Sequence, residues 1–306
     1  MKYVVTGANG FTGRRMVEIL LEQGSEVVAL SRDTEWLTAH QHPRLRALAW
    51  TAEQDAPLDA LANADALFHL AAFRPPNQND SAFARQCLEV NALGTLKLLE
   101  AALQASVRRF VYFSAGNSYL PLPRPAAEDD PLFPAHRATF YLASKIVGEL
   151  YAAFFHHARA LPVTTLRVSS IYGRGMTEQT LIRRFIASLQ AGKPIIVEDG
   201  GRFTADFVDV DDVIRLALLL TEQKADGSYN AGSGTPLSTL ELAQHIVRAL
   251  NASPELIHLQ PAATASAGFS ALDITKAKSL GYAPVQFSQG LASLLQWLEQ
   301  VKGVTT

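Results

Sequence analysis

Short apolar runs rich in β-branched and aromatic residues alternate with longer stretches of helical periodicity along the first half of the chain. The pattern predicts strands at residues 2–6, 26–30, 45–49, 66–70, 109–114 and 163–168. Helices are predicted at residues 11–23, 83–105 and 141–158. Such alternation is typical of an α/β fold, a doubly wound parallel sheet with helices on both faces, in which ligands bind beyond the carboxyl ends of the strands.

The pattern becomes irregular after residue 170, where short elements are separated by glycine and proline. We expect a smaller, discontinuous lobe there that binds the substrate, formed by residues 171–203 and 233–306. The larger domain would comprise residues 1–170 and be rejoined by about residues 204–232. The segment 205–220 is expected to return to the main sheet.

Composition narrows the class of partner. A net charge of −2 over 306 residues gives no electrostatic basis for binding nucleic acid or an anionic membrane, so a small-molecule partner is expected. The single cysteine, Cys87, cannot form an internal disulfide, and the start MKYVVTG is not a signal sequence. No stretch approaches the ~20 apolar residues of a membrane helix, and no metal-ligand spacing is evident. These features predict a cytoplasmic protein without a metal.

A glycine-rich loop follows the first predicted strand and opens the first predicted helix. The loop reads TGANGFTG over residues 6–13. Gly7 permits a tight turn, Gly10 lets the backbone approach a pyrophosphate, and Gly13 allows close packing of helix on strand. The helix N-terminus supplies N–H groups and a positive dipole for the phosphates. The loop therefore predicts a dinucleotide-binding domain of the Rossmann type.

The end of the second predicted strand bears on the choice of cofactor. It reads Ser31-Arg32-Asp33. An acidic residue at this point binds the ribose 2′-hydroxyl of NAD, whereas an arginine accommodates the 2′-phosphate of NADP. Ser31 and Arg32 favour NADP. NAD stays possible, since a small shift would place the Asp33 carboxylate at the ribose, and Arg32 could also be a solvated surface charge.

Further motifs recur in order along nearly the whole chain. They are TGANGFTG, FHLAA at 68–72, Asn91, FVYFS at 110–114, Tyr141-x-x-x-Lys145, LRVSSIYG at 166–173, DFVDVDD at 206–212, YNAGSG at 229–234 and LGYAP at 280–284. With these motifs the chain resembles the extended short-chain dehydrogenase/reductases, and more closely the NAD-dependent epimerase/dehydratase family, which acts mostly on nucleotide sugars. The resemblance implies a homodimer through the helices at 83–105 and 141–158.

The resemblance also implies positions for the cofactor and the substrate. Serine stands at Ser170 and alanine at Ala205, where the family often has asparagine and arginine against the nucleotide diphosphate. Ser170 is still expected to contact substrate, and Arg174 and Arg202 are possible replacements, because guanidinium groups suit phosphate oxygens. The residues expected to bind the cofactor are Gly7, Asn9, Gly10, Phe11, Thr12, Gly13, Ser31, Arg32, Leu70, Ala71, Ala72, Asn91, Tyr141, Lys145 and Val168.

Tyr141 and Lys145 form the expected proton-transfer pair. Their spacing of four residues places both on one face of a helix. An adjacent ammonium and the positive nicotinamide ring would favour the tyrosine phenolate. Tyr141 would then exchange a proton with a substrate hydroxyl or carbonyl while a hydride moves to or from the nicotinamide, and Lys145 would also hold the nicotinamide ribose.

The strand end at residues 110–114 departs from the family pattern. Alignment of Tyr119 with the tyrosine of the family's V-Y-G turn puts Ala115 where a serine or threonine hydroxyl normally polarises the reacting oxygen. Ser114 is the nearest donor, although strand alternation points it to the other face unless the chain bulges. Ser118 and then Asn117 are the next candidates. Ser114 is therefore expected as the third catalytic residue, with Asn117 and Ser118 contacting substrate.

These expectations lead to one preferred function. It is NAD(P)-dependent hydride transfer at a carbon of a nucleotide-activated sugar, as a 4-ketoreductase or a 4-epimerase. Dehydration is less favoured, because Gly116 and Asn117 replace the acidic pair that elimination would use. The alternatives are an NADPH-dependent reductase of a non-sugar carbonyl, favoured by Ala205, and a cofactor-sensing protein without catalysis, which Tyr141 and Lys145 argue against.

Overall fold

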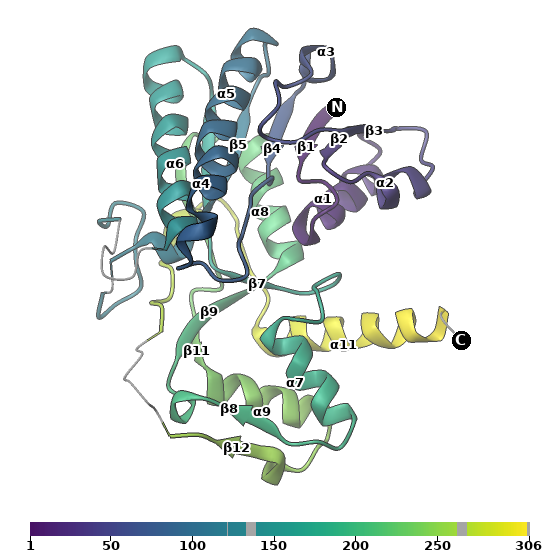
Figure 1. The fold of residues 1–306 in the computed structure, drawn as a ribbon, viewed down its shortest axis with the longest axis vertical. Coiled ribbons are helices and arrows are strands. Elements are labelled where there is room, and N and C mark those ends of the chain that lie inside the picture. The colour runs from purple at the N-terminus through teal and green to yellow at the C-terminus, as the bar shows by residue number, and fades with distance from the viewer. Residues whose placement is uncertain (121, 133–138, 262–267, 305–306) are drawn as a thin grey trace. The chain divides into compact units, whose positions relative to one another are not determined.

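The computed structural model describes residues 1–120, 122–132, 139–261 and 268–304. Its largest element is a seven-stranded sheet with the order β10-β6-β5-β4-β1-β2-β3. Figure 1 shows β5, β4, β1, β2 and β3 of this sheet side by side. Every pairing from β6 to β3 is parallel. The strands are β1 (Lys2–Thr6), β2 (Glu26–Ser31), β3 (Leu45–Ala49), β4 (Ala66–His69), β5 (Phe110–Ala115), β6 (Val163–Val168) and β10 (Gly227–Ala231). The predicted doubly wound α/β sheet is confirmed, and each of the six predicted strands is present to within one residue at either end.

Two compact units emerge from the contacts within the chain. The first comprises Met1–Leu120, Asp129–Val168 and Ile214–Tyr229, and the second comprises Pro121–Glu128, Ser169–Val213 and Asn230–Thr306. The domain boundaries expected from the sequence stay a prediction. One detail was wrong: the strand within the segment 205–220 pairs outside the main sheet, because β9 (Thr204–Asp209) lies between β7 (Ser170–Tyr172) and β11 (Pro236–Ser238).

Helices of the first unit follow the strands in the expected order. They are α1 (Phe11–Glu22), α2 (Glu35–Ala39), α3 (Leu58–Leu61), η1 (Ser81–Phe83), α4 (Ala84–Cys87), η2 (Leu88–Leu93), α5 (Gly94–Gln104), η3 (Gly116–Ser118) and α6 (Phe140–Arg159). The single helix predicted at 83–105 consists of three consecutive segments, α4, η2 and α5, since η2 is a π-helical stretch between the two α-helices. Such π-helical segments are frequent at functional sites. Helix α8 (Val210–Glu222) joins this unit from Ile214 onward.

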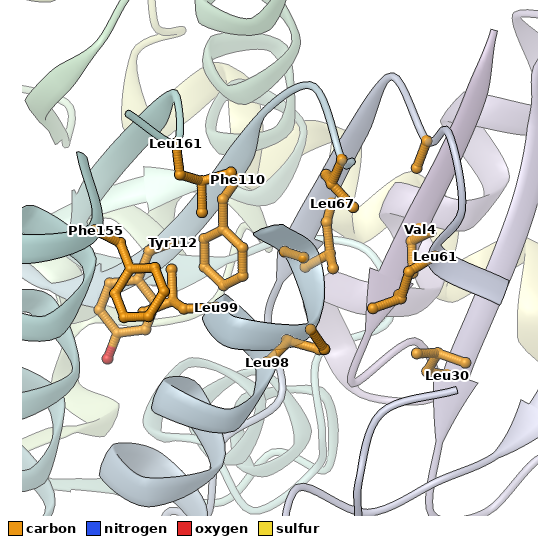
Figure 2. Close-up of a cluster of buried hydrophobic side chains, with 14 of the residues drawn as sticks. Val4, Leu30, Leu61, Leu67, Leu98, Leu99, Phe110, Tyr112, Phe155 and Leu161 are labelled. Carbon is orange, nitrogen blue, oxygen red and sulfur yellow. The ribbon is translucent and has the colours of Figure 1, made fainter. Parts of the chain in front are cut away.

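The main core lies between the sheet and helices α3, α5 and α6. In Figure 2, Val4, Leu30, Leu67 and Phe110 of the sheet lie against Leu61, Leu98, Leu99 and Phe155 of these helices. Val28 and Leu30 on β2, and Phe110 and Tyr112 on β5, alternate along their strands, as expected for residues that share one face of a sheet. The intervening strand residues are buried too, so the sheet is covered on both faces. The cluster combines Val4, Leu30, Leu67, Phe110 and Tyr112 of the sheet with Leu61, Leu98, Leu99, Phe155 and Leu161.

The second unit holds the remaining elements. Besides the three-stranded sheet it contains a two-stranded parallel sheet of β8 (Ile195–Val197) and β12 (Ile257–Leu259). Its helices are α7 (Leu181–Gln190), η4 (Asp199–Gly201), α9 (Thr239–Ala249), η5 (Pro254–Leu256), α10 (Thr275–Lys278) and α11 (Phe287–Val304). The buried Asp206 carboxylate accepts hydrogen bonds from the backbone N–H groups of Ser233, Gly234 and Leu272, which ties two loops to β9. Within the described ranges, no helix is long and apolar enough to cross a membrane.

A buried histidine connects three elements beneath the glycine loop. His69 at the end of β4 is fully buried, with Nδ1 2.8 Å from Thr6 Oγ1 and Nε2 2.9 Å from Thr95 Oγ1. Thr95 Oγ1 in turn donates to the carbonyl of Asn91. Burial lowers the pKa of His69 to about 3, with the charge of Lys145 acting in the same direction. His69 is therefore a neutral structural residue.

The folded protein should become less stable as the pH is lowered, because of His69. The unfolded chain protonates this histidine below its ordinary pKa of ~6.5, whereas the folded protein stays neutral there until about pH 3. The free energy of unfolding should therefore decrease by about 1.4 kcal/mol for each unit of pH below ~6.5 on this account alone. Urea unfolding at pH 7 and pH 5 measures it. His69→Asn should be less stable at pH 7 and show a flatter pH dependence. His258→Asn, at an exposed histidine, is the control for the substitution itself.

Candidate active site

The glycine loop has the geometry expected of a phosphate-binding turn. Gly7 has a positive φ of 66°, and a Cβ on it would lie 2.7 Å from the backbone nitrogen of Ala71. A Cβ on Gly13 would lie 2.1 Å from the carbonyl oxygen of Gly7, so only glycine lets α1 pack so closely on the loop. Gly10 occupies the N-cap position of α1, and no side chain caps that end among the described residues. The first N–H groups of α1 are thus left for a ligand.

The neighbouring segment after β4 is fixed to the loop and to the helix that carries Tyr141. Thr6 Oγ1 accepts a hydrogen bond from the backbone N–H of Ala71. Asn91 accepts from the backbone N–H of Phe73 at 2.7 Å and donates to its carbonyl at 2.9 Å. The Asn91 amide also donates to Ser144 Oγ, which donates to the carbonyl of Tyr141. Asn91 therefore has a structural role here, and its expected contact with the cofactor stays a prediction.

The end of β2 distinguishes Arg32 from Asp33. Ser31 is the buried last residue of the strand, and Arg32 is exposed. Both carboxylate oxygens of Asp33 are engaged locally: Oδ1 accepts from the backbone N–H of Glu35, and Oδ2 accepts from the Asn9 amide. Asp33 is thus held in the turn that begins α2. Of these two charged residues, Asp33 is the only one whose side chain forms hydrogen bonds in the described part of the chain.

Tyr141 and Lys145 lie on the face of α6 that packs against the sheet. Lys145 is buried, and its Nζ lies 4.2 Å from the centre of the Tyr112 ring on β5. Burial lowers the pKa of Lys145 to about 7, and the Glu149 carboxylate opposes this shift. Burial raises the pKa of Tyr141, and the charge of Arg74 opposes that. The predicted effect of Lys145 and the nicotinamide ring on the Tyr141 phenolate therefore stays a prediction for the cofactor-bound enzyme.

Two serine hydroxyls at the end of β5 and in the turn after it have no hydrogen-bond partner among the described residues. The register of β5 with β6 runs unbroken to Ala115, so no bulge interrupts strand alternation. Ser114 therefore shares a face with Tyr112, whose hydroxyl donates to the carbonyl of Lys145 at 3.0 Å, and Ala115 faces the other way. Ser118, in the following η3, is fully buried. The Oγ atoms of Ser114 and Ser118 are both buried and have no partner in the part of the chain that the structure describes, an uncommon state for polar atoms that points to a ligand.

The remaining expected residues are placed as follows. Asn117 is half-buried in η3, Val168 is the buried last residue of β6, and Leu70 and Ala72 follow β4. Ser170 is half-buried in β7 of the second unit, where Arg174 and Arg202 are exposed. Ala205 is buried within β9. These expected contacts stay predictions, and no group of three His, Cys, Asp or Glu side chains could hold a metal in the described ranges.

Sequence reasoning missed two features around Tyr141. Arg74, an exposed residue after β4, is the positive charge whose field reaches the tyrosine. Glu149, one turn beyond Lys145 on α6, is buried and acts electrostatically on the lysine. The spacing Tyr141, Lys145, Glu149 was a signal for the second, because residues four apart share a helix face. No local pattern marks Arg74, whose position depends on how the loop folds.

The fold and the site together define a dinucleotide-dependent oxidoreductase, and comparison with known proteins gives its family. The model of the "NAD dependent epimerase/dehydratase family" matches residues 3–232. The chain belongs to this family and is an oxidoreductase-type enzyme of the extended short-chain dehydrogenase/reductase class, which confirms the resemblance. The family is NAD-dependent.

Individual relatives carry out more than one reaction. The dTDP-glucose 4,6-dehydratase of Streptomyces niveus is 30% identical over 97% of this chain and 92% of the relative. The UDP-glucose 4-epimerase of Mycolicibacterium smegmatis is 31% identical over 97% of this chain and 98% of the relative. A solved double mutant of the dTDP-glucose 4,6-dehydratase DesIV from Streptomyces venezuelae, with NAD bound, superposes with a TM-score of 0.87 at 28% identity, covering 99% and 98% of the two chains.

Replacing Ser118 by alanine should lower the activity without lowering the stability. The hydroxyl has no partner within the described ranges, so its loss should leave the free energy of unfolding unchanged or slightly higher. If the hydroxyl binds the reacting oxygen, the rate of hydride transfer should fall about 100-fold, the size of an oxyanion-donor effect. Urea unfolding and nicotinamide absorbance measure the two quantities. The matched control is Ser144→Ala, which removes a paired hydroxyl and should cost about 1 kcal/mol of stability. An unchanged rate in Ser118→Ala would show that this hydroxyl takes no part.

Proposed function

We propose that this protein transfers hydride at a carbon of a nucleotide-activated sugar, as a 4-ketoreductase or a 4-epimerase. The observation that carries the proposal is the placement of Tyr141 and Lys145 on the α6 face that packs on β5. At the end of that strand, the hydroxyls of Ser114 and Ser118 are unpaired as far as the described residues go. This arrangement offers a proton carrier and hydrogen-bond donors for one oxygen. Relatives named for dTDP-glucose and UDP-glucose support a nucleotide sugar as the substrate.

Each residue has a distinct task in the proposed reaction. When bound, the nicotinamide cofactor supplies or takes the hydride. Tyr141 exchanges the proton of the substrate oxygen, and Ser114 or Ser118 donates a hydrogen bond to that oxygen as its charge develops. Lys145 binds the nicotinamide ribose and places positive charge beside the phenol. The glycine loop and the N-terminus of α1 hold the pyrophosphate.

The turn after β5 favours reduction or epimerisation over dehydration. Elimination of water needs an acid and a base in addition to the hydride carrier. The turn consists of Gly116, Asn117 and Ser118, and it contains no carboxylate. The dehydratases among the relatives support the substrate class, and this turn supports a different outcome for the reaction.

Arg32 favours NADP as the cofactor. Its guanidinium follows β2 at the position where the adenosine ribose of a dinucleotide lies in this fold. The Asp33 carboxylate is held by Glu35 and Asn9, which leaves the arginine to meet a 2′-phosphate. The solved relative binds NAD, so NADP selectivity would distinguish this chain from that enzyme.

A reductase of a non-sugar carbonyl is the second candidate. Ala205, buried in β9, stands where an arginine often contacts the diphosphate. If no other residue takes over that contact, the protein has no need of a nucleotide on its substrate.

Calorimetric titration with NADPH and NADH, followed by titration of the NADPH complex with UDP, GDP and dTDP, tests these proposals. NADP-selective binding together with a response to one nucleotide supports the ketoreductase and identifies the nucleotide. A tightly retained NAD that does not exchange supports the epimerase. Indifference to all three nucleotides contradicts a nucleotide-sugar substrate and favours the non-sugar carbonyl.

Arg32→Ala should weaken NADPH binding about 10- to 100-fold, because one charge-assisted hydrogen bond contributes ~1.5–3 kcal/mol. NADH binding should change little, since NADH carries no 2′-phosphate. The matched control is Arg108→Ala, which removes an exposed arginine paired with Asp65 and should leave both affinities unchanged. Equal loss of NADPH and NADH affinity in Arg32→Ala would contradict a role for Arg32 in selectivity.

An exposed apolar surface on helices η2 and α6 supports the expected homodimer. Leu150 and Phe154, one turn apart on α6, are 64% and 52% exposed. Leu88 and Leu93 of η2 are 55% and 47% exposed, and η2 packs against α6. Contiguous exposed apolar side chains of this size mark interaction surfaces. A second copy of the chain, presenting the same helices, would bury them in a two-fold symmetric contact.

The double substitution Leu150→Glu with Phe154→Glu should convert the dimer to a monomer, because four charges would meet across the two-fold axis and apolar burial would be lost. Light scattering during size-exclusion chromatography should give twice 33.2 kDa for the wild type and 33.2 kDa for the variant. Leu58→Glu, on α3, is the matched control for adding charge at an exposed leucine and should stay dimeric. A monomeric wild-type protein would refute the dimer.

A further inference from the structure

Helix α6 carries a further polar side chain, that of the buried Glu149, in line with Tyr141 and Lys145. Glu149 follows Lys145 by four residues, as Lys145 follows Tyr141, so all three share one helix face. Glu149 is 6% exposed and Lys145 is 2% exposed, so the carboxylate and the amine are both largely removed from water. A buried carboxylate one turn from a buried amine interacts with it strongly, since little solvent screens the two charges.

Arg167 on β6 fixes the position of this carboxylate. Its Nε and Nη2 both donate to Glu149 Oε1, at 2.9 and 2.6 Å. Its Nη1 donates to the hydroxyl of Tyr119 at 2.8 Å, and its guanidinium lies 5.0 Å from the centre of the Tyr119 ring. Arg167, Glu149 and Tyr119 are all buried. The guanidinium is therefore held by Glu149 of α6 and by Tyr119 after η3, and the Nε and Nη2 bonds to Glu149 both go to one carboxylate oxygen.

The second oxygen of Glu149 is uncommitted. Oε2 is buried and accepts no hydrogen bond within the described ranges of the chain. A carboxylate that served only to join α6 to β6 would be expected to use both oxygens on a guanidinium, whose fork suits that arrangement. Here Arg167 holds the Glu149 carboxylate through Oε1, and Oε2 accepts no hydrogen bond from the described residues.

Several ionisable groups surround Lys145, and Glu149 is the one that sustains its charge. Tyr112 on β5 presents its ring face to the amine, His69 on β4 is neutral, and the Tyr141 phenol is on the same helix. Burial favours the neutral amine, and the Glu149 carboxylate is the charge that opposes it. Arg167 is positive and is already paired with Glu149.

We propose that Glu149 is a positioning residue for the Tyr141–Lys145 pair: Arg167 holds its carboxylate one helical turn behind Lys145, where its negative charge keeps the buried amine protonated. Only the catalytic role of the Lys145 ammonium rests on the proposed function. The protonation of Lys145 itself can be measured whatever the reaction, so failure of the two proposals can be told apart.

The test is a pH titration of the Lys145 side chain by NMR. Protein labelled with ¹³C at lysine Cε reports protonation through the carbon shift, and Lys145→Arg assigns the signal by its disappearance. The wild-type midpoint should lie near 7, far below the ordinary lysine value of 10.5. In Glu149→Gln the midpoint should fall by about one pH unit or more, the size expected for the loss of a close opposite charge.

Three variants control the interpretation. Glu149→Asp keeps the charge and should keep the midpoint close to the wild-type value. Glu89→Gln removes an exposed carboxylate paired with Arg85 and should not move it. Should Glu149→Gln not fold, the double variant Glu149→Met with Arg167→Met removes both charges of the pair without leaving either unpaired, and its midpoint should still fall.

Two results would overturn the proposal. One is an unchanged Lys145 midpoint in the folded charge-removing variants, which would show that the Glu149–Arg167 pair only joins α6 to β6. The other is an equal fall in Glu149→Asp and Glu149→Gln, which would assign the effect to packing and not to charge.

Discussion

The close contact of helix α6 with strand β5 is the constraint on which the site depends. A Cβ on Gly148 would lie 2.4 Å from the hydroxyl of Tyr112, so the absence of a side chain there lets the helix approach the strand. Tyr112 then donates a hydrogen bond to the carbonyl of Lys145 and presents its ring to the Lys145 amine. This one packing contact thus determines the position, the burial and the surroundings of Tyr141 and Lys145.

Burial at the contact of α6 with β5 stabilises the fold, but it disfavours the charged forms that proton exchange would use. An amine and a phenol removed from water both favour their neutral forms, as the directions of the Lys145 and Tyr141 pKa values show. Proton exchange at neutral pH needs charge to be available in the pair. The structure surrounds the pair with charges that oppose desolvation: Glu149 acts on the lysine, and Arg74 acts on the tyrosine. Such opposition between burial and charge is typical of functional sites.

Buried hydrogen bonds between side chains also hold the glycine loop in position. His69 contacts Thr6 and Thr95, and Asn91 ties the segment after β4 to the start of α6 through Ser144. These side chains lie on different elements and are buried, so their hydrogen bonds are made in a region of low dielectric constant, where they hold geometry well. The glycine loop, the segment after β4 and the first turn of α6 are therefore linked through side chains and not only through the backbone.

The sequence by itself determined the strands, the glycine loop and the Tyr141–Lys145 pair, because each follows from a short period or from a local steric requirement. Strand runs are read from apolar alternation, Gly7 and Gly13 from backbone space, and the pair from the four-residue helix spacing. Tertiary structure alone decided that β9 pairs outside the main sheet, that Arg74 acts on Tyr141, and that Arg167 anchors Glu149. Those outcomes join residues far apart in the chain, and the free energy of such contacts depends on burial and on the distance between charges, which no local pattern of residues records.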